Sequence, residues 1–263
     1  MTPDYWHKQT AGKPLHPDML WSRPENRLLA GKLLIIGGNA QGFAAVGEAY
    51  TAATRAGIGV ARMYLPDVLH KVLGRSFEAG EFGPSTPSGS FSQRGLAEGL
   101  AMANWADAVL LAGDLGRNSE TAILLEKFTT KYTGQLTITR DAAEYCISTP
   151  SGCFDRPDTC FVVSLAQLQK LAIQARFTTA FTFEMDILRF LDALHVFTLA
   201  HPIAIVVKHL GNIFVAFDGQ VSSTKSDDED KVWRARTAAA CATWWLQNPA
   251  KTFAALSTAL VSD

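Results

Sequence analysis

The feature that most constrains the fold is an apolar run, a pair of glycines and a helix of small residues within residues 33–59. The run KLLIIGG (32–38) is continuously apolar up to its glycines, which is typical of a strand buried on both faces. Residues 44–57 are rich in Ala and Thr and end at a glycine, which predicts a helix with a glycine stop. This strand, glycine turn and helix predict an α/β domain whose first turn faces a ligand.

Strand-like and helix-like segments alternate through most of the remaining sequence. Further strands are predicted over 58–66, 106–116, 134–142 and 159–164, with a hairpin of two strands over 202–221. Helices are predicted over 67–75, 95–106, 119–132, 165–175, 183–200, 232–247 and 250–261, and a Gly/Ser/Pro-rich loop over 78–93. This alternation predicts right-handed crossovers and a mainly parallel sheet covered on both faces, with antiparallel strands added late.

The bulk composition limits the classes of function. Residues 1–31 are polar and are predicted to form an N-terminal arm. Residues 32–263 are predicted to form a single domain. Its core should be sizeable, because 48% of the residues of the chain are apolar. The formal net charge of −1 gives no electrostatic support for nucleic-acid binding. No apolar run reaches the roughly 18–20 residues of a membrane span, and the N-terminus has no signal-peptide core. We therefore expect a cytoplasmic protein.

The cysteines and histidines show no metal-site spacing. There is no C-x-x-C pair, and no histidine stands at ligand spacing beside a cysteine. Buried thiols in a reducing cytosol are favoured over a zinc site, so no metal ligand is predicted. The residues concerned are Cys146, Cys153, Cys160 and Cys241, with His195 and His201 interpreted as structural.

Two glycine turns follow apolar strands and are candidates for ligand contact. The first contains Gly38 and Asn39 and leads into a helix with Ala45 near its start. Helix N–H groups beyond such a turn can meet an anion. The pattern is not G-x-G-x-x-G and has no acidic ribose ligand at the expected spacing, which disfavours a Rossmann dinucleotide site. A tight turn without a ligand remains the alternative.

The second turn contains Gly113, Asp114 and Gly116 after the strand AVLLA. Parallel strands end at the same edge of a sheet, so two such turns would form one crevice, the usual ligand site of open α/β sheets.

Charged residues near two later element ends are further candidates. Lys208 ends the strand IAIVVK and precedes Gly211, where an ammonium group can meet a phosphate or simply be solvated. The acidic cluster that precedes the helix at 232–247 can cap that helix or supply a general base, and it consists of Asp227, Asp228, Glu229 and Asp230.

Together these segments resemble the ribokinase-like superfamily, and within it the ADP/ATP-dependent NAD(P)H-hydrate dehydratases. The stretch GKLLIIGGNAQGFAAVGEAYTAATRAGIGVARMYLP is similar to the family's opening strand, glycine turn, helix and second strand. ADAVLLAGDLGRN resembles ADA-x-x-IGPGLGR, LTITRDA resembles LVLDADA with Asp141 as the retained aspartate, and KHLGNIFVAFDGQV resembles the KGAGT segment. The resemblance runs from about Leu28 to about Leu256 and implies a three-layer α/β/α ribokinase-like fold.

The resemblance also implies roles for individual residues. Ala45 and Gly116 stand where the family contacts the hydrated nicotinamide cofactor, and the same substrate end is expected to include Gly38, Asn39, Gly113 and Asp141. Lys208 and Gly211 match the segment that binds the phosphates of ADP or ATP, with Mg²⁺ as a possible companion. Asp230 takes the place of the catalytic base, in a reaction that phosphorylates the hydrate NADHX or NADPHX and then eliminates phosphate.

Three departures from the family pattern leave the function open. Its H-P-G-E is here Ser164, Leu165, Ala166 and Gln167; its G-S-G is here Asp227, Asp228 and Glu229; and Asp114 stands for the proline of GPGLG. A carboxylate about 4 Å from a phosphate charge costs on the order of 4 kcal/mol at an effective dielectric near 20. The readings are a divergent dehydratase, a non-catalytic nucleotide- or dinucleotide-binding protein, and a small-alcohol kinase. Self-association through the Trp-bearing arm is also expected.

Overall fold

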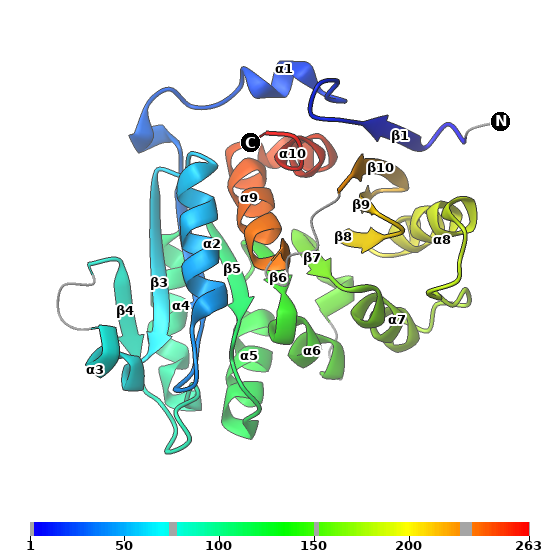
Figure 1. Ribbon diagram of the computed structural model, residues 1–263. Helices are drawn as coiled ribbons and strands as arrows, with labels where there is room; N and C mark the ends of the chain where they lie inside the picture. The colour runs from blue at the N-terminus through cyan, green and yellow to red at the C-terminus, as the bar shows by residue number, and fades with distance from the viewer. Residues whose placement is uncertain (1–2, 74–77, 150–152, 227–232, 263) are drawn as a thin grey trace.

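The computed structural model describes residues 3–73, 78–149, 153–226 and 233–262, and it is a mixed sheet with helices on both faces (Figure 1). The strands are β1 (Trp6–Gln9), β2 (Lys32–Gly37), β3 (Val60–Pro66), β4 (Gly80–Gly83), β5 (Ala108–Gly113), β6 (Gln135–Thr139), β7 (Thr159–Val163), β8 (Ile203–His209), β9 (Asn212–Phe217) and β10 (Gln220–Lys225). The helices are α1 (Pro17–Leu20), α2 (Ala44–Arg55), α3 (His70–Leu73), α4 (Leu96–Trp105), α5 (Ser119–Lys131), α6 (Arg140–Ser148), α7 (Leu165–Gln174), α8 (Ile187–Ala200), α9 (Trp233–Gln247) and α10 (Thr252–Ala259).

The strands form one sheet in the order β1-β10-β9-β8-β7-β6-β5-β2-β3-β4. All neighbouring pairs from β8 to β4 are parallel, while β9 is antiparallel to both of its neighbours, β8 and β10. The predicted mainly parallel sheet with a late antiparallel addition is therefore confirmed. The parallel strands end at one common edge, which is where ligands of open α/β sheets bind.

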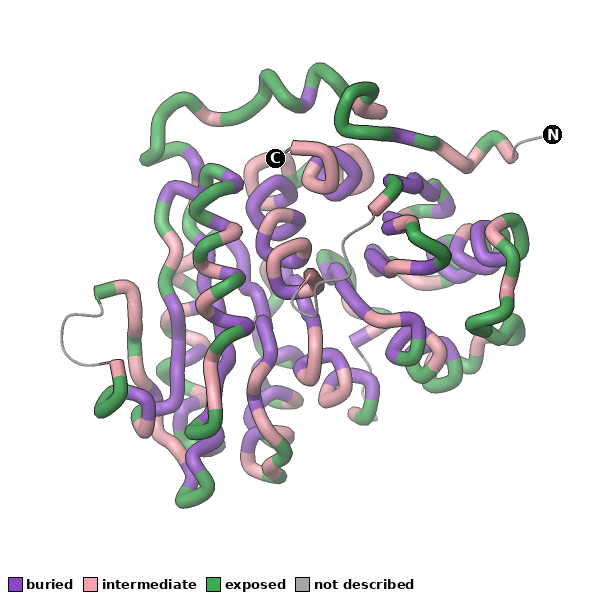
Figure 2. The backbone as a smooth tube through the Cα atoms, viewed as in Figure 1, coloured by how far each residue is buried: buried purple, intermediate pink, exposed green. Residues whose placement is uncertain are grey.

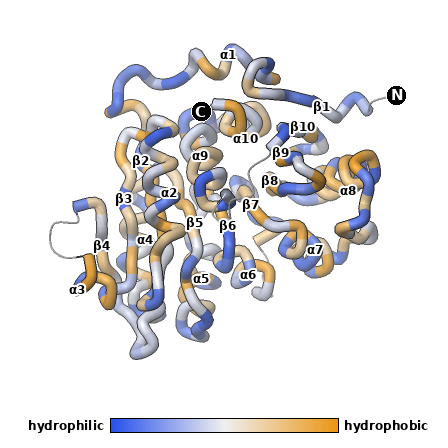
Figure 3. Tube along the Cα trace, in the orientation of Figure 1, coloured by the Kyte–Doolittle hydropathy of each residue, from blue (hydrophilic) through white to orange (hydrophobic). Residues whose placement is uncertain are grey.

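Strand β2 shows why the sheet is covered on both faces. Leu34 and Ile36 pack into a core with α4, α5, α6, α7 and α8, whereas Leu33 and Ile35 pack on the other face with α2, α9 and α10. All four side chains are buried because successive residues of a strand point to opposite faces. Figure 2 shows the burial of these central strands, and Figure 3 shows apolar residues concentrated along them and on α8.

Four elements differ from the sequence-based predictions. The predicted loop over 78–93 contains β4, which pairs with β3, and the predicted strand over 134–142 ends at Thr139, where α6 begins. The predicted two-strand hairpin is a three-strand unit, because β10 follows β9 directly. Within the predicted arm over 1–31, β1 pairs in parallel with β10 at the edge of the sheet. Among the described residues, no helix is both long and apolar enough to span a bilayer.

Candidate functional site

The two glycine turns lie side by side at the carboxyl edge of the sheet. The N–H of Gly38 donates to the carbonyl of Gly113 at 3.0 Å, and the Asn39 side chain donates to the carbonyl of Asp114 at 2.6 Å. Strands β2 and β5 are neighbours, so the turns that follow them meet directly. The structure thus brings Gly38, Asn39 and Gly113 together at one edge of the sheet, and a ligand crevice between the two turns stays a prediction.

The carboxylate of Asp114 lies at the N-terminus of helix α2 and accepts a hydrogen bond there. Its Oδ2 accepts from the N–H of Ala45 at 2.7 Å, and its Oδ1 accepts from Nη2 of Arg140 at 2.8 Å. Both side chains are largely buried, with exposed fractions of 18% for Asp114 and 27% for Arg140. A helix N-terminus attracts anions, and here the protein supplies the anion itself.

The backbone of this turn revises the sequence comparison at Asp114. Its φ is +57°, whereas a proline ring holds φ near −65°, so Asp114 does not stand in a proline-like position. The conformation is one that glycine adopts most readily. Gly113 itself has φ +102°, and a Cβ there would lie 2.6 Å from Oδ1 of Asp141.

The carboxylate of Asp141 accepts hydrogen bonds from the backbone of the next two residues of this turn. Its Oδ2 accepts from the N–H of Leu115 at 2.8 Å and from the N–H of Gly116 at 3.2 Å. Its Oδ1 is buried without a hydrogen-bond partner among the described residues. Burial raises the pKa of the Asp141 carboxyl above its ordinary value, and the two N–H groups oppose that shift.

The raised pKa of Asp141 predicts a specific pH dependence of stability. Between the ordinary value of 3.8 and the raised value, the folded state binds more protons than the unfolded state. The free energy of unfolding should therefore fall as pH rises through this interval, and Asp141→Asn should remove that component of the slope. Urea unfolding of both proteins, in steps from pH 3.8 to neutral pH, measures it. Parallel slopes for the two proteins would contradict the prediction.

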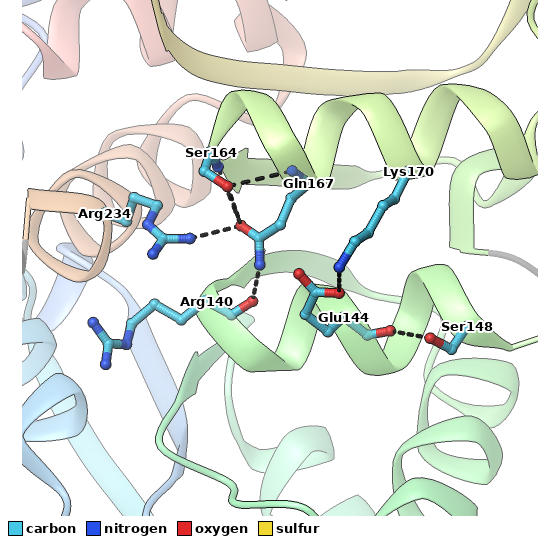
Figure 4. A network of polar contacts seen from close by, with 7 residues as sticks. All are labelled: Arg140, Glu144, Ser148, Ser164, Gln167, Lys170 and Arg234. Atoms are coloured by element: carbon cyan, nitrogen blue, oxygen red, sulfur yellow. Dashed lines mark hydrogen bonds and ion pairs between the residues drawn. The ribbon is translucent and has the colours of Figure 1, made fainter.

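A polar network joins α6, α7 and α9 beside this turn (Figure 4). Gln167 lies in the first turn of α7, where it forms a capping box with Ser164, and its Nε2 donates to the carbonyl of Arg140 at 2.6 Å. Nη1 of Arg234 donates to Oε1 of Gln167 at 2.6 Å. Ser164 and Gln167, two of the residues whose place in the sequence resembles an H-P-G-E motif, thus cap helix α7, and Gln167 also accepts a hydrogen bond from Arg234. Arg140 and Arg234 are not among the residues predicted from the sequence; Arg140 falls inside the strand predicted over 134–142, whereas the structure begins α6 there.

The predicted nucleotide residues lie further along the same edge. Lys208 is the penultimate residue of β8, three strands from β5, and Gly211 forms the turn into β9 with φ +71°. The carbonyl of Gly211 accepts from the N–H of Ser226 at 2.9 Å. The predicted base Asp230 lies outside the described residues, as do Asp227, Asp228 and Glu229.

A hollow of about 420 Å³ opens beside Ser226, between α2, α9, α10 and the ends of β9 and β10. Its lining combines an indole, cationic side chains and small residues, including Arg55, Lys225, Trp233, Arg236 and Ala240. The volume falls within the roughly 300–1,000 Å³ of small-molecule sites. The hollow could not be predicted from the sequence, because its walls come from segments far apart in the chain.

The remaining candidates from the sequence lie elsewhere. Among the described residues, no group of three or more His, Cys, Asp or Glu side chains could hold a metal ion. His195 stacks on Tyr5 and contacts the carbonyl of Gly219, and His201 lies 3.2 Å from the carboxylate of Asp155. The four cysteines are buried free thiols.

No protein-family model and no curated protein sequence matches the chain. Solved structures do match it. A ribokinase-like superfamily protein from Enterococcus faecalis superposes with a TM-score of 0.70 at 16% identity, over 100% of this chain and 88% of that one. Hypothetical protein SMU.573 from Streptococcus mutans gives 0.70 at 15% identity, over 93% and 86%. The ADP/ATP-dependent NAD(P)H-hydrate dehydratase from Bacillus subtilis, co-crystallised with ATP/Mg²⁺, gives 0.59 at 10% identity, over 94% and 86%. The chain therefore has a ribokinase-like fold.

Proposed function

We propose that this protein binds a nucleotide or a dinucleotide without carrying out the NAD(P)H-hydrate dehydratase reaction. The observation that carries the proposal is the 2.7 Å contact between the Asp114 carboxylate and the N–H of Ala45. By the family resemblance, this amide would face the hydrated cofactor, and here an internal carboxylate accepts its hydrogen bond. Arg140 holds that carboxylate in place from the other side. The amide that the resemblance assigns to the substrate is thus already hydrogen-bonded to Asp114, which Arg140 holds in place.

The hollow beside β10 supports the binding half of the proposal. Trp233 is among the lining residues, and an indole is a side chain on which a base can stack; Arg55 and Arg236 line the same hollow with positive charge. Gly211 and Ser226, which are joined by a backbone hydrogen bond, connect the hollow to the turn predicted to meet nucleotide phosphates.

The test measures binding and turnover on the same preparation. Calorimetry with ADP, ATP, NADH and NADPH reports binding, and incubation with NADHX, a nucleotide and Mg²⁺ reports turnover through the absorbance of regenerated NADH. Binding without turnover supports the proposal. NADH formation above the protein-free rate overturns the proposal. The proposal is also overturned if none of the four ligands binds.

Asp114→Gly should strengthen the binding of NADH about tenfold, because it frees a helix N–H whose charge-assisted hydrogen bond contributes roughly 1.5 kcal/mol. Glycine also suits the φ of +57° at this position. The matched control is Asp218→Gly, which changes a residue with φ +48° in the turn between β9 and β10. Calorimetric titration of both variants measures the effect. Equal NADH affinities would show that Asp114 does not close the site.

The dehydratase itself is the second candidate, and Asp141 favours it. This aspartate is retained from the family pattern and binds the N–H of Gly116, a predicted substrate residue. The substrate would be NADHX or NADPHX, with ADP or ATP as phosphate donor. The described residues offer no acidic cluster for Mg²⁺, and we assign no step to a metal. The turnover assay above decides between the two candidates, and a small-alcohol kinase stays a prediction.

Self-association and a cytoplasmic location also stay predictions. Within the described part of the arm, the most exposed large apolar side chains have exposed fractions of 89% for Trp21, 88% for Leu28 and 75% for Leu29. Such a group of exposed apolar residues is suited to contact with another protein surface.

A further inference from the structure

The N-terminal arm passes over α10 and ends in β1 at the edge of the sheet (Figure 1). Two kinds of contact hold it there. The first is the pairing of β1 with β10, supported by the Gln9 side chain, which donates hydrogen bonds to both β10 and α10. The second is aromatic, because the rings of His7 and His16 both form edge contacts with Phe253 of α10, at centroid distances of 5.9 and 6.1 Å. The arm is therefore docked on α10 partly through two imidazoles.

The surroundings of the His16 ring offer nothing to accept an additional proton. Its Nε2 is buried and has no hydrogen-bond partner among the described residues. The charged groups that face the ring from other elements are His7 of β1 and Lys251, directly before α10, and α10 itself contains no ionisable residue. The nearby charges of the arm itself, Lys13 and Asp18, belong to none of the described ion pairs. A protonated imidazole has an N–H on both nitrogens, so its Nε2–H would be buried without an acceptor.

The docked arm therefore binds protons less readily than the undocked arm. Burial, followed by the positive charges of His7 and Lys251, lowers the pKa of His16 below its ordinary value of 6.5. In an undocked arm the same ring would be in water, where its pKa is the ordinary one. The undocked state thus binds more protons below pH 6.5, and docking weakens as the pH falls through that value until the lowered pKa is reached.

We propose that His16 is a pH-sensitive switch of the N-terminal arm, which keeps the arm docked on α10 while its imidazole is neutral and releases the arm when the imidazole is protonated. Release would also change the hollow beside Ser226, because Ala11 of the same arm is one of its lining residues. Mild acid would then remove part of one wall of the hollow. Arm release of this kind needs no bound nucleotide, so it is measured on the protein alone.

Hydrogen exchange of the full chain, followed by mass spectrometry, measures the docking of the arm. From about pH 7.5 to about pH 5.5, the interval in which histidine titrates, exchange in β1 should rise at least about threefold after correction for the intrinsic pH dependence of amide exchange. Exchange in β5, inside the sheet, should not rise, because only the arm opens. His16→Phe keeps an aromatic ring beside Phe253 but cannot titrate, so corrected exchange in β1 should then be independent of pH.

The matched control is His70→Gln on α3, because His70 is exposed outside the arm and also forms an edge contact with a phenylalanine, Phe82. This variant should keep the wild-type rise in β1. A rise that persists in His16→Phe would overturn the switch, and so would a wild-type β1 whose corrected exchange does not change with pH. An equal rise in β5 would indicate unfolding of the whole sheet and would also overturn it. If circular dichroism shows that His16→Phe does not fold, His16→Gln replaces it with the same expectation.

Discussion

Replacing Gly37 with alanine should lower the free energy of unfolding by about 3 kcal/mol, because overpacking at a buried strand end forces the backbone apart. A Cβ at this position would lie 2.3 Å from the carbonyl oxygen of Gly113 and 2.7 Å from Cγ2 of Val46. The first of these atoms belongs to the backbone of β5, so no side-chain rotation relieves the contact. The substitution would separate β2 from β5 at the point where both candidate turns begin.

The matched control is Gly47→Ala, within helix α2, where a Cβ would meet no atom within 4 Å. Alanine in a helix interior is favoured over glycine by about 0.5–1 kcal/mol, so this variant should be slightly more stable than the wild-type protein. Chemical denaturation of the three proteins measures both effects. Equal unfolding free energies for Gly37→Ala and the wild-type protein would show that the two strands can separate freely.

Replacing Arg156 with alanine should lower the free energy of unfolding by about 4 kcal/mol, since hydrogen bonds from a charged group contribute roughly 1.5–3 kcal/mol each. The guanidinium lies at the end of the sheet opposite the candidate site and donates to four backbone carbonyls and one hydroxyl. The acceptors are Tyr132, Gly134, Pro157, Asp158 and Thr159. Its loss would remove this shared donor where β6 and β7 begin, although the carbonyls of Pro157 and Asp158 would still accept from Thr159 Oγ1 and from the N–H of Leu136.

Two further variants distinguish the loss of the hydrogen-bond network of Arg156 from the loss of a positive charge. Arg156→Lys keeps a positive charge but not the fork, so it should recover only part of the lost stability. Arg189→Ala removes an arginine that is 82% exposed and should change stability by less than about 0.5 kcal/mol. Thermal and urea unfolding measure all three. A loss for Arg156→Ala no greater than that for Arg189→Ala would contradict the role of the network.

The parts of the fold that the sequence predicts well are those with a strong local pattern. The apolar run of β2, the glycine stop after α2 and the alternation that follows are local features, and the structure places each element within a few residues of its predicted bounds. Strand β10 was missed because it lacks such a pattern. Its buried Ser222, Ser223 and Thr224 are satisfied by side chains from the arm and from α10, which are far away in the sequence.

In the candidate site, too, the sequence predicts the features that have a local pattern and not the contacts between distant elements. Positions of the turn residues follow from the strands that precede them, so Gly38, Asn39 and Gly113 could be placed at one edge from the sequence. The partners of Asp114 could not, because Ala45 and Arg140 reach it from two other elements. Arg140 and Arg234 are linked through Gln167 of α7, so their placement depends on how three separate helices meet, and no local pattern in the sequence encodes that arrangement.

The pairing of β1 with β10 has a consequence for the order in which the molecule is completed. Gln9 bonds Thr224, which lies 215 residues later, and at about 5–20 residues per second a ribosome makes that partner roughly 10–40 s after Gln9 itself. During this interval the first strand has no neighbour, and Trp6 has no Ser223 to bond. The arm therefore docks after the rest of the sheet has been synthesised. A ribosome that stalls before β10 leaves the earliest strand exposed to other chains and to proteases.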